Sequence, residues 1–94
     1  MEINLDGDEI RSESAFHDAI AQAARSIGFE GYGRNLDALS DLLTGVLPRP
    51  LRIRWSDADV SRHAIGPRFD RLVETVREAE RELGPSELQL AMEA

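Results

Sequence analysis

The stretch Leu51-Arg52-Ile53-Arg54-Trp55 alternates apolar and charged side chains without a break. Strict alternation predicts a β-strand with one buried and one exposed face, because successive side chains of a strand point to opposite sides. Strands of a parallel sheet that is covered by helices on both faces read instead as continuous apolar runs. Arg52 and Arg54 break that rule, so the sheet is expected to carry helices on one face only.

Two more strands are predicted near the ends of the chain. Residues 2–5 alternate before an Asp6-Gly7 turn, and residues 88–92 alternate leucine and methionine with Gln89 and Ala91. A hairpin that continues from the first strand to Ile10 is the alternative, because Asp-Gly also favours tight hairpin turns.

Helical periods fill the space between these strands. Ser14 is a plausible N-cap for a first helix that ends at Gly28. A short helical turn is expected over residues 56–62, and the strongest helical period runs from Pro67 to Gly84. The apolar positions of the first helix are Phe16, Ile20, Ala23 and Ile27.

A further short helix is predicted to begin at its N-cap Asn35 and to end at Gly45, after a glycine-rich loop over residues 28–34. Leu36, Leu39 and Leu43 lie on one face of it. Strands that alternate with helices favour parallel pairing through right-handed crossovers. The predicted fold class is therefore α/β: a single domain over residues 1–94 with two layers, a three-stranded parallel sheet and helices packed on one face.

The chain is acidic, with 18 Asp and Glu against 11 Arg, a formal net charge of −7, and no cysteine. This charge repels nucleic acid and anionic membranes and attracts basic proteins. The absence of cysteine excludes disulfide scaffolds and thiolate metal sites, and it suits a reducing compartment. With no signal-peptide pattern and no apolar run of roughly 20 residues, a soluble cytoplasmic protein is expected.

Two aspartates stand out on the short helix. Asp37, Asp41 and Thr44 form a stripe away from the leucines, and no base one turn further on offsets Asp41. Arg34 lies outside the helix and can form an ion pair with Asp37 at most. Two acids one turn apart without a nearby base slightly destabilise a short helix. Such locally unfavourable residues are expected at binding sites. Two solvated surface acids are the alternative interpretation.

A second acidic row is spaced by four residues along the long helix, with arginines at offsets that can neutralise much of it. This pattern favours an ordinary solvated face. The acids are Asp70, Glu74, Glu78 and Glu82, and the arginines are Arg71, Arg77 and Arg81.

Enzymatic and metal chemistry find little support in the sequence. Asp37 and Asp41 are one helical turn apart on a convex surface, whereas catalytic carboxylates need a cleft. His17 and His63 have no metal-ligand partner three or four residues further on. His17 is expected to be a partly buried, hydrogen-bonded structural residue, and Trp55 a core residue. We therefore predict a protein that is not an enzyme and needs no cofactor or metal.

One segment resembles a known family. The sequence from Tyr32 to Gly45, Tyr-Gly-Arg-Asn-Leu-Asp-Ala-Leu-Ser-Asp-Leu-Leu-Thr-Gly, is similar to the signature of the barstar family, intracellular inhibitors of barnase-type bacterial ribonucleases. The family also has similar segments at three other places. These are Ile10-Arg11-Ser12 with the following amphipathic helix that carries His17, the strand from Leu51 to Trp55, and Val76 to Ala79. The resemblance implies a three-stranded parallel sheet with helices packed on it, and inhibition by carboxylates that mimic RNA phosphate.

The resemblance also implies where a partner would bind. Asp41 would be the central anchor with Asp37 beside it, and Glu78 would add a peripheral charge. The partner-contacting residues implied are Gly31, Tyr32, Gly33, Arg34, Asn35, Asp37, Ala38, Ser40, Asp41, Thr44, Gly45, Val46 and Glu78.

The chain departs from the family pattern around these acids. Gly31, Ser40 and Val46 replace the family's aromatic contacts, and Arg34 replaces what is often an acid. The partner implied is a small ribonuclease with a basic site, barnase-like or a related guanyl-specific enzyme. The alternative is an immunity or adaptor module of the same fold that binds a different toxin domain or a non-nuclease protein.

Overall fold

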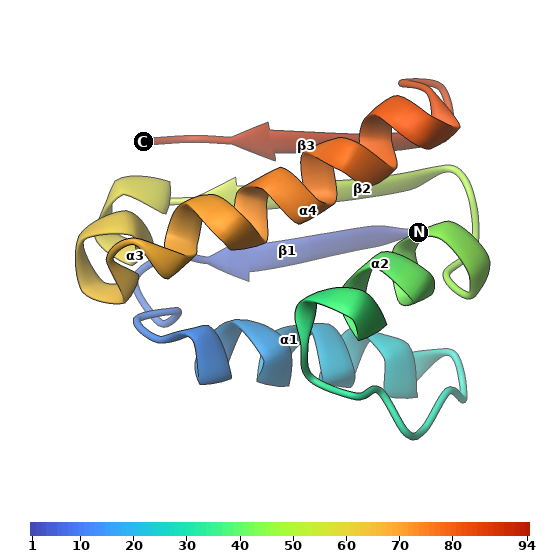
Figure 1. The fold of residues 1–94 in the computed structure, drawn as a ribbon, viewed down its shortest axis with the longest axis horizontal. Coiled ribbons are helices and arrows are strands. Elements are labelled where there is room, and N and C mark those ends of the chain that lie inside the picture. Colours follow the sequence, from blue (N-terminus) through green and yellow to red (C-terminus); the bar gives the residue numbers. More distant parts are fainter.

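The computed structural model describes residues 1–94 and contains one sheet of three strands together with four helices (Figure 1). In chain order these are β1 (Glu2–Asp6), α1 (Glu13–Ser26), α2 (Leu36–Gly45), β2 (Leu51–Ser56), α3 (Ala58–Ile65), α4 (Arg68–Leu83) and β3 (Leu88–Met92).

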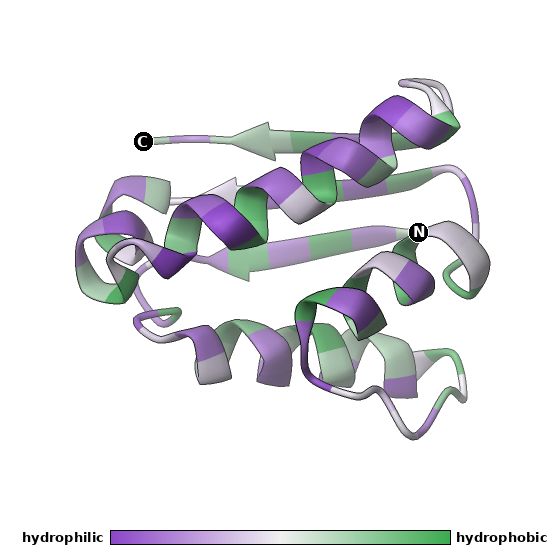
Figure 2. Cartoon of the chain, in the orientation of Figure 1, coloured by the Kyte–Doolittle hydropathy of each residue, from purple (hydrophilic) through white to green (hydrophobic).

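The sheet is parallel throughout, in the order β1-β2-β3. Its central register aligns Ile3 with Ile53 and Ile53 with Leu90. Alternate positions of each strand are buried, and the hydropathy bands in Figure 2 follow the same period. Arg52 and Arg54 are exposed, so the prediction of a two-layer fold with one open sheet face is confirmed.

Helices α2 and α4 pack against each other in front of the sheet, and α1 lies along β1 (Figure 1). Their apolar faces close over a core that centres on Trp55, which is 1% exposed. The Trp55 ring lies 5.3 Å from the Phe16 ring and 5.1 Å from the Phe69 ring, centroid to centroid. Its indole N–H donates to the Ser61 hydroxyl at 3.0 Å, so the one polar atom of this side chain is satisfied.

The start of the chain differs from the prediction in two ways. Ser12, and not Ser14, caps α1: its hydroxyl accepts the Ala15 N–H at 3.0 Å, which leaves Ser14 inside the first turn. Nor does β1 continue into a hairpin. The Gly7 N–H donates to the Ser56 carbonyl of β2 at 2.7 Å, so the turn continues the parallel pairing.

Two helices are also larger or more buried than predicted. The segment after β2 forms a complete helix, α3, that extends to Ile65 and ends at Gly66 with a φ of +77°. On α2, Leu42 is as buried as Leu39 and Leu43, whereas Leu36 is only half-buried. Leu42 borders the same hollow as Phe29 and Tyr32 of the preceding loop, and the buried face of α2 is wider than predicted by this one residue.

Candidate binding surface

Helix α2 is held rigidly at both its start and its buried face. The Asn35 side-chain oxygen accepts the Ala38 N–H at 2.7 Å, which satisfies one of the free amides of the first turn. Leu39, Leu42 and Leu43 are at most 1% exposed. Because burying each leucine stabilises the fold by roughly 1.5–3 kcal/mol, the position and rotation of α2 are fixed.

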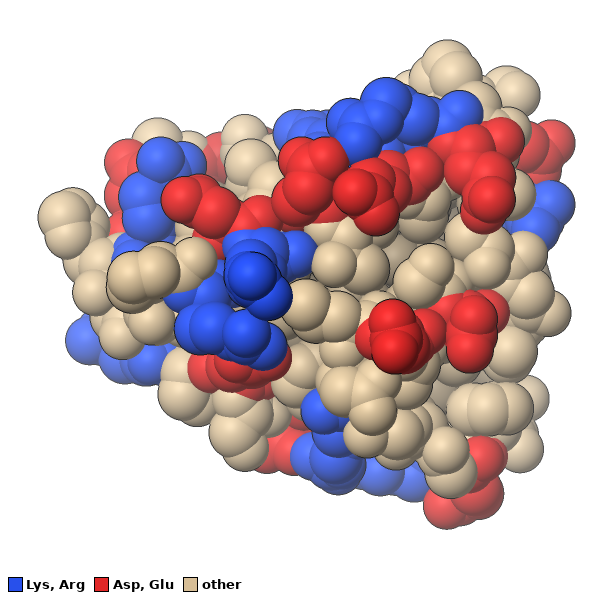
Figure 3. All heavy atoms as spheres, in the orientation of Figure 1, with Lys and Arg blue, Asp and Glu red and all other residues tan.

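The outer face of α2 carries two unpaired acids. Asp37 and Asp41 are both exposed, and neither lies within ion-pair distance of any Arg, His or the amino terminus. Figure 3 shows acidic side chains over α2 and over α4 on the same face of the molecule. The expectation that Asp41 has no compensating base is therefore confirmed.

Arg34 forms an ion pair with Asp18 of α1 and not with Asp37, the partner that the sequence offered for it. Its backbone adopts the left-handed region, with a φ of +55°. Such a conformation costs a residue with a side chain of the order of 1 kcal/mol. The ion pair ties the loop to α1 and leaves Asp37 without a partner.

The acidic row on α4 is neutralised less than predicted. Glu74 is paired with Arg81 at 2.7 Å, whereas Arg77 pairs with Glu80, which lies outside the row. Glu78 is exposed and makes no ion pair. The carboxylate of Glu78 is thus free on the helix that packs against α2.

A shallow hollow of about 170 Å³ lies beside Asp41. Its walls come from the loop before α2 and from α2 itself, and they are mostly apolar. The lining residues are Phe29, Gly31, Tyr32, Gly33, Ala38, Asp41, Leu42 and Val46. Asp37 does not line this hollow, so the two aspartates share no cleft of the kind that an acid–base pair needs.

Tyr32 anchors the wall of this hollow to the interior. Its hydroxyl lies 2.7 Å from Nδ1 of His17, which is 3% exposed. The His17 Nε2 lies 3.4 Å from Glu13, and Glu13 accepts two hydrogen bonds from Arg68 at the start of α4. His17 is therefore hydrogen-bonded through Nδ1, as predicted, while its Nε2 makes no hydrogen bond. The side chain is fully rather than partly buried.

Burial and these contacts shift the pKa values of Glu13, His17 and Tyr32. The hydrogen bonds from Arg68 lower the pKa of the Glu13 carboxyl. Burial lowers the pKa of His17 and raises that of the Tyr32 phenol. His17 is therefore more strongly held in its neutral form than a solvated histidine would be.

The other residues implied by the resemblance border the two aspartates. Gly31, Gly33 and Gly45 are exposed, as is Val46 at 37%. Ala38, Ser40 and Thr44 are half-buried, and the Thr44 hydroxyl donates to the Ser40 carbonyl at 2.8 Å. None of the implied contact residues is buried, and all but Glu78 belong to α2 or to the segments that adjoin it.

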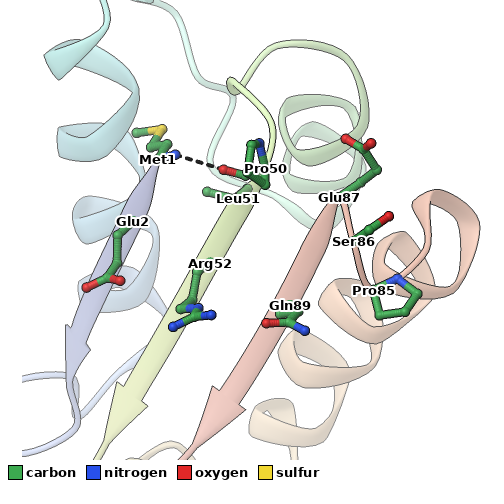
Figure 4. Close-up of a pocket in the computed structure, with 9 residues that line it drawn as sticks. All are labelled: Met1, Glu2, Pro50, Leu51, Arg52, Pro85, Ser86, Glu87 and Gln89. Atoms are coloured by element: carbon green, nitrogen blue, oxygen red, sulfur yellow. Dashed lines mark hydrogen bonds between the residues drawn. The ribbon is translucent and has the colours of Figure 1, made fainter.

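A larger hollow, of about 530 Å³, lies elsewhere, on the open face of the sheet (Figure 4). Glu2, Arg52 and Gln89 project into it from neighbouring strands, and the amino terminus donates to the Pro50 carbonyl at its rim at 2.8 Å. Its charges are of mixed sign, so it does not extend the acidic surface.

No group of three or more His, Asp or Glu side chains lies close enough to hold a metal ion. The helices are too short and too polar for any of them to cross a bilayer.

Comparison with known proteins places the chain in one family. The sequence model described as "Barstar (barnase inhibitor)" matches residues 1–93. The chain is also similar to the "Putative ribonuclease inhibitor YrdF" of Bacillus subtilis (strain 168), with 33% identity over 81 residues, which cover 86% of this chain and 87% of that protein.

Proposed function

The chain belongs to the barstar family, and on this basis we propose that it inhibits a ribonuclease by inserting an acidic surface into the enzyme's basic active site. We define the acidic surface as Asp37, Asp41 and Glu78 with the hollow beside Asp41. The name of the Bacillus subtilis relative, "Putative ribonuclease inhibitor YrdF", supports this assignment.

The observation that carries the proposal is the absence of any ion pair at Asp37 and Asp41, on a helix whose position is fixed by its buried leucines. A carboxylate without an intramolecular partner has no internal contact to lose when it binds a cation of another protein. A rigid helix also adds little ordering cost on binding. These features suit a preformed site for a basic partner.

The mechanism we propose is mimicry of RNA phosphate. An enzyme that cleaves RNA holds the phosphate with cationic side chains, and carboxylate oxygens can accept the same hydrogen bonds. Asp41 is the central anchor in this proposal because it borders the hollow, where water is most readily excluded. Asp37 lies one turn earlier on α2, and Glu78 contributes from α4.

Charge also sets the speed of association. The net charge of −7 and the acids that lie over α2 and α4 attract a basic enzyme over a long range. Long-range attraction is screened by salt over about 10 Å at 0.1 M ionic strength. Association is therefore expected to slow as salt is added.

The shape and charge of the surface restrict which ribonuclease could fit it. Tyr32 is the one aromatic side chain among the proposed contacts, and Gly31 and Val46 leave the hollow open. Arg34 adds a positive charge at its edge. On the family resemblance we propose a small guanyl-specific microbial ribonuclease, which need not be barnase. From the shape and charge of the surface we expect that enzyme to have a protruding side chain that fills the hollow and no cation opposite Arg34. The proposed place of action is the cytoplasm of the cell that makes or meets the enzyme.

The direct test is the affinity of Asp41→Asn for purified guanyl-specific ribonucleases. This change keeps the shape of the side chain and removes its charge. A cation of the ribonuclease is then left without a counter-charge in a desolvated interface, which costs roughly 3–5 kcal/mol of binding free energy. Glu9→Gln is the matched control, since Glu9 is an exposed acid without an ion pair, outside the acidic surface. Equal affinities for the two variants would refute the role of Asp41.

A panel of ribonucleases separates this proposal from a module that binds a different toxin domain or a non-nuclease protein. We expect inhibition of at least one guanyl-specific enzyme, with association that slows as salt is added. Failure to inhibit every ribonuclease of the panel would favour the alternative partner.

A further inference from the structure

The outer edge of β3 has no neighbouring strand. Alternate residues of a strand direct their backbone groups to opposite sides. The Glu93 N–H donates to the Trp55 carbonyl of β2 at 2.8 Å, so the odd-numbered residues of β3 face β2. The backbone groups of Leu88, Leu90 and Met92 therefore face outward, where a further strand could pair with them.

Two side chains of α4 occupy the middle of this edge. The Leu90 N–H donates to Oε2 of Glu80 at 2.8 Å, and the Leu90 carbonyl accepts from the Arg77 guanidinium at 2.9 Å. Arg77 and Glu80 also pair with each other at 3.1 Å. Both outward-facing groups of Leu90 are thus taken by charged partners, whose hydrogen bonds are stronger than those of neutral groups.

The Leu88 N–H is taken as well, by the Gly84 carbonyl at 3.1 Å. With Leu90, this leaves the first half of the edge without a free N–H for an incoming strand. The ion pair is partly shielded from solvent, since the Arg77 and Glu80 side chains are 33% and 21% exposed. Its geometry therefore persists better than that of a fully exposed pair.

The two edges of the sheet are protected in different ways. β1 carries Glu2 and Asp6 and has α1 beside it. β3 has the sequence Leu-Gln-Leu-Ala-Met, which contains neither charge nor proline. A short uncharged edge strand is the kind of segment that pairs with another copy of itself. The residues of β3 therefore do not themselves protect its edge from pairing with another strand. The Arg77 and Glu80 side chains of α4 provide this protection.

We propose that the Arg77–Glu80 pair is an edge clip, which prevents a second copy of this chain from adding its own β3 to this edge. The incoming strand would run antiparallel about a two-fold axis at Leu90 and join the two sheets. In that register Glu87 of one copy faces Glu93 of the other. Repulsion between these acids opposes the pairing at low salt, and added salt relieves it.

The test variant is Arg77→Ala/Glu80→Ala, studied by sedimentation equilibrium at low and high salt. The matched control is Glu74→Ala/Arg81→Ala, which removes another Arg–Glu pair from the same helix, 2.7 Å apart and without a hydrogen bond to β3. We expect the test variant to dimerise, more strongly at high salt, and the control and the unaltered chain to stay monomeric.

Amide hydrogen exchange gives a second readout in the folded monomer. Loss of a hydrogen bond to a charged group is expected to speed exchange at Leu90 by about tenfold or more, with Ala91, which faces β2, little affected. If the double variant does not fold, Glu80→Ala is measured instead, because Arg77 then keeps its contact with the Leu90 carbonyl. A folded variant that stays monomeric at high salt and keeps the Leu90 exchange rate would overturn the proposal.

Discussion

The Nδ1 atom of His17 lies 2.7 Å from the hydroxyl oxygen of Tyr32, and this contact joins the interior of α1 to the loop that borders the acidic surface. Through Glu13 and Arg68 the same chain of contacts reaches the start of α4. The loop before α2 is thus fixed from inside the fold, and its outer side remains free for a partner.

Removing the hydroxyl in Tyr32→Phe leaves Nδ1 of a buried histidine without a partner. The expected loss in the free energy of unfolding is about 1–3 kcal/mol, measured by urea denaturation. A double-mutant cycle with His17→Leu isolates the contact, because the loss at Tyr32 should largely disappear when the histidine is absent. Additive effects would show that the contact does not stabilise the fold.

The stability of the chain is expected to depend on pH through His17. Burial lowers the pKa of this residue in the native state, so below about pH 6.5 the unfolded chain binds more protons than the native chain. Unfolding is then favoured as the pH falls through this window towards the native pKa, by at most about 1.4 kcal/mol per pH unit. Above pH 6.5 the contribution is constant.

Thermal or urea denaturation between pH 5 and pH 7.5 checks this dependence. His17→Gln should flatten the slope, whereas His63→Gln, which changes an exposed histidine, should not. Glu13 has a pKa below its ordinary value of 4.5 in the native state, so its protonation does not contribute to the pH dependence between pH 5 and pH 7.5. An unchanged slope in His17→Gln would assign the dependence to another group.

The turn after β1 leaves no room for a side chain at Gly7. A Cβ atom at this position would lie 2.0 Å from the Asp57 carbonyl oxygen, so Gly7→Ala must push β1 and the end of β2 apart. We expect a loss of roughly 1–3 kcal/mol, as for other overpacked sites. Gly45→Ala is the control, since a Cβ there meets nothing within 4 Å; calorimetry should show a marked fall in Tm for the first variant alone.

The sequence was most informative where structure depends on neighbouring residues. The alternation around Arg52 and Arg54 predicted the one-sided sheet, and the leucine period predicted α2 between Asn35 and Gly45, because both patterns are local. The cap at Ser12 was missed because Ser14 is an equally good capping residue by type. The burial of Leu42 was missed because the helical spacing of Leu36, Leu39 and Leu43 does not include it.

The surroundings of the proposed contact residues could not be predicted in the same way. The contact of Arg34 with Asp18, and that of Arg68 with Glu13, join residues 16 and 55 positions apart. Local spacing contains no signal for either contact. The resemblance implied that Asp37 and Asp41 contact a partner. That Asp37 has no ion pair could not be predicted from the sequence, because it depends on the contact of Arg34 with Asp18.

The chain contains a single tryptophan and a single tyrosine, in very different surroundings. Trp55 is enclosed by Phe16 and Phe69 in the core, and Tyr32 lies beside the acidic surface. Indole fluorescence should therefore report unfolding and remain almost constant when a partner binds, whereas the phenol absorbance should respond to the partner. A silent tryptophan in a titration is consequently no sign that binding has failed.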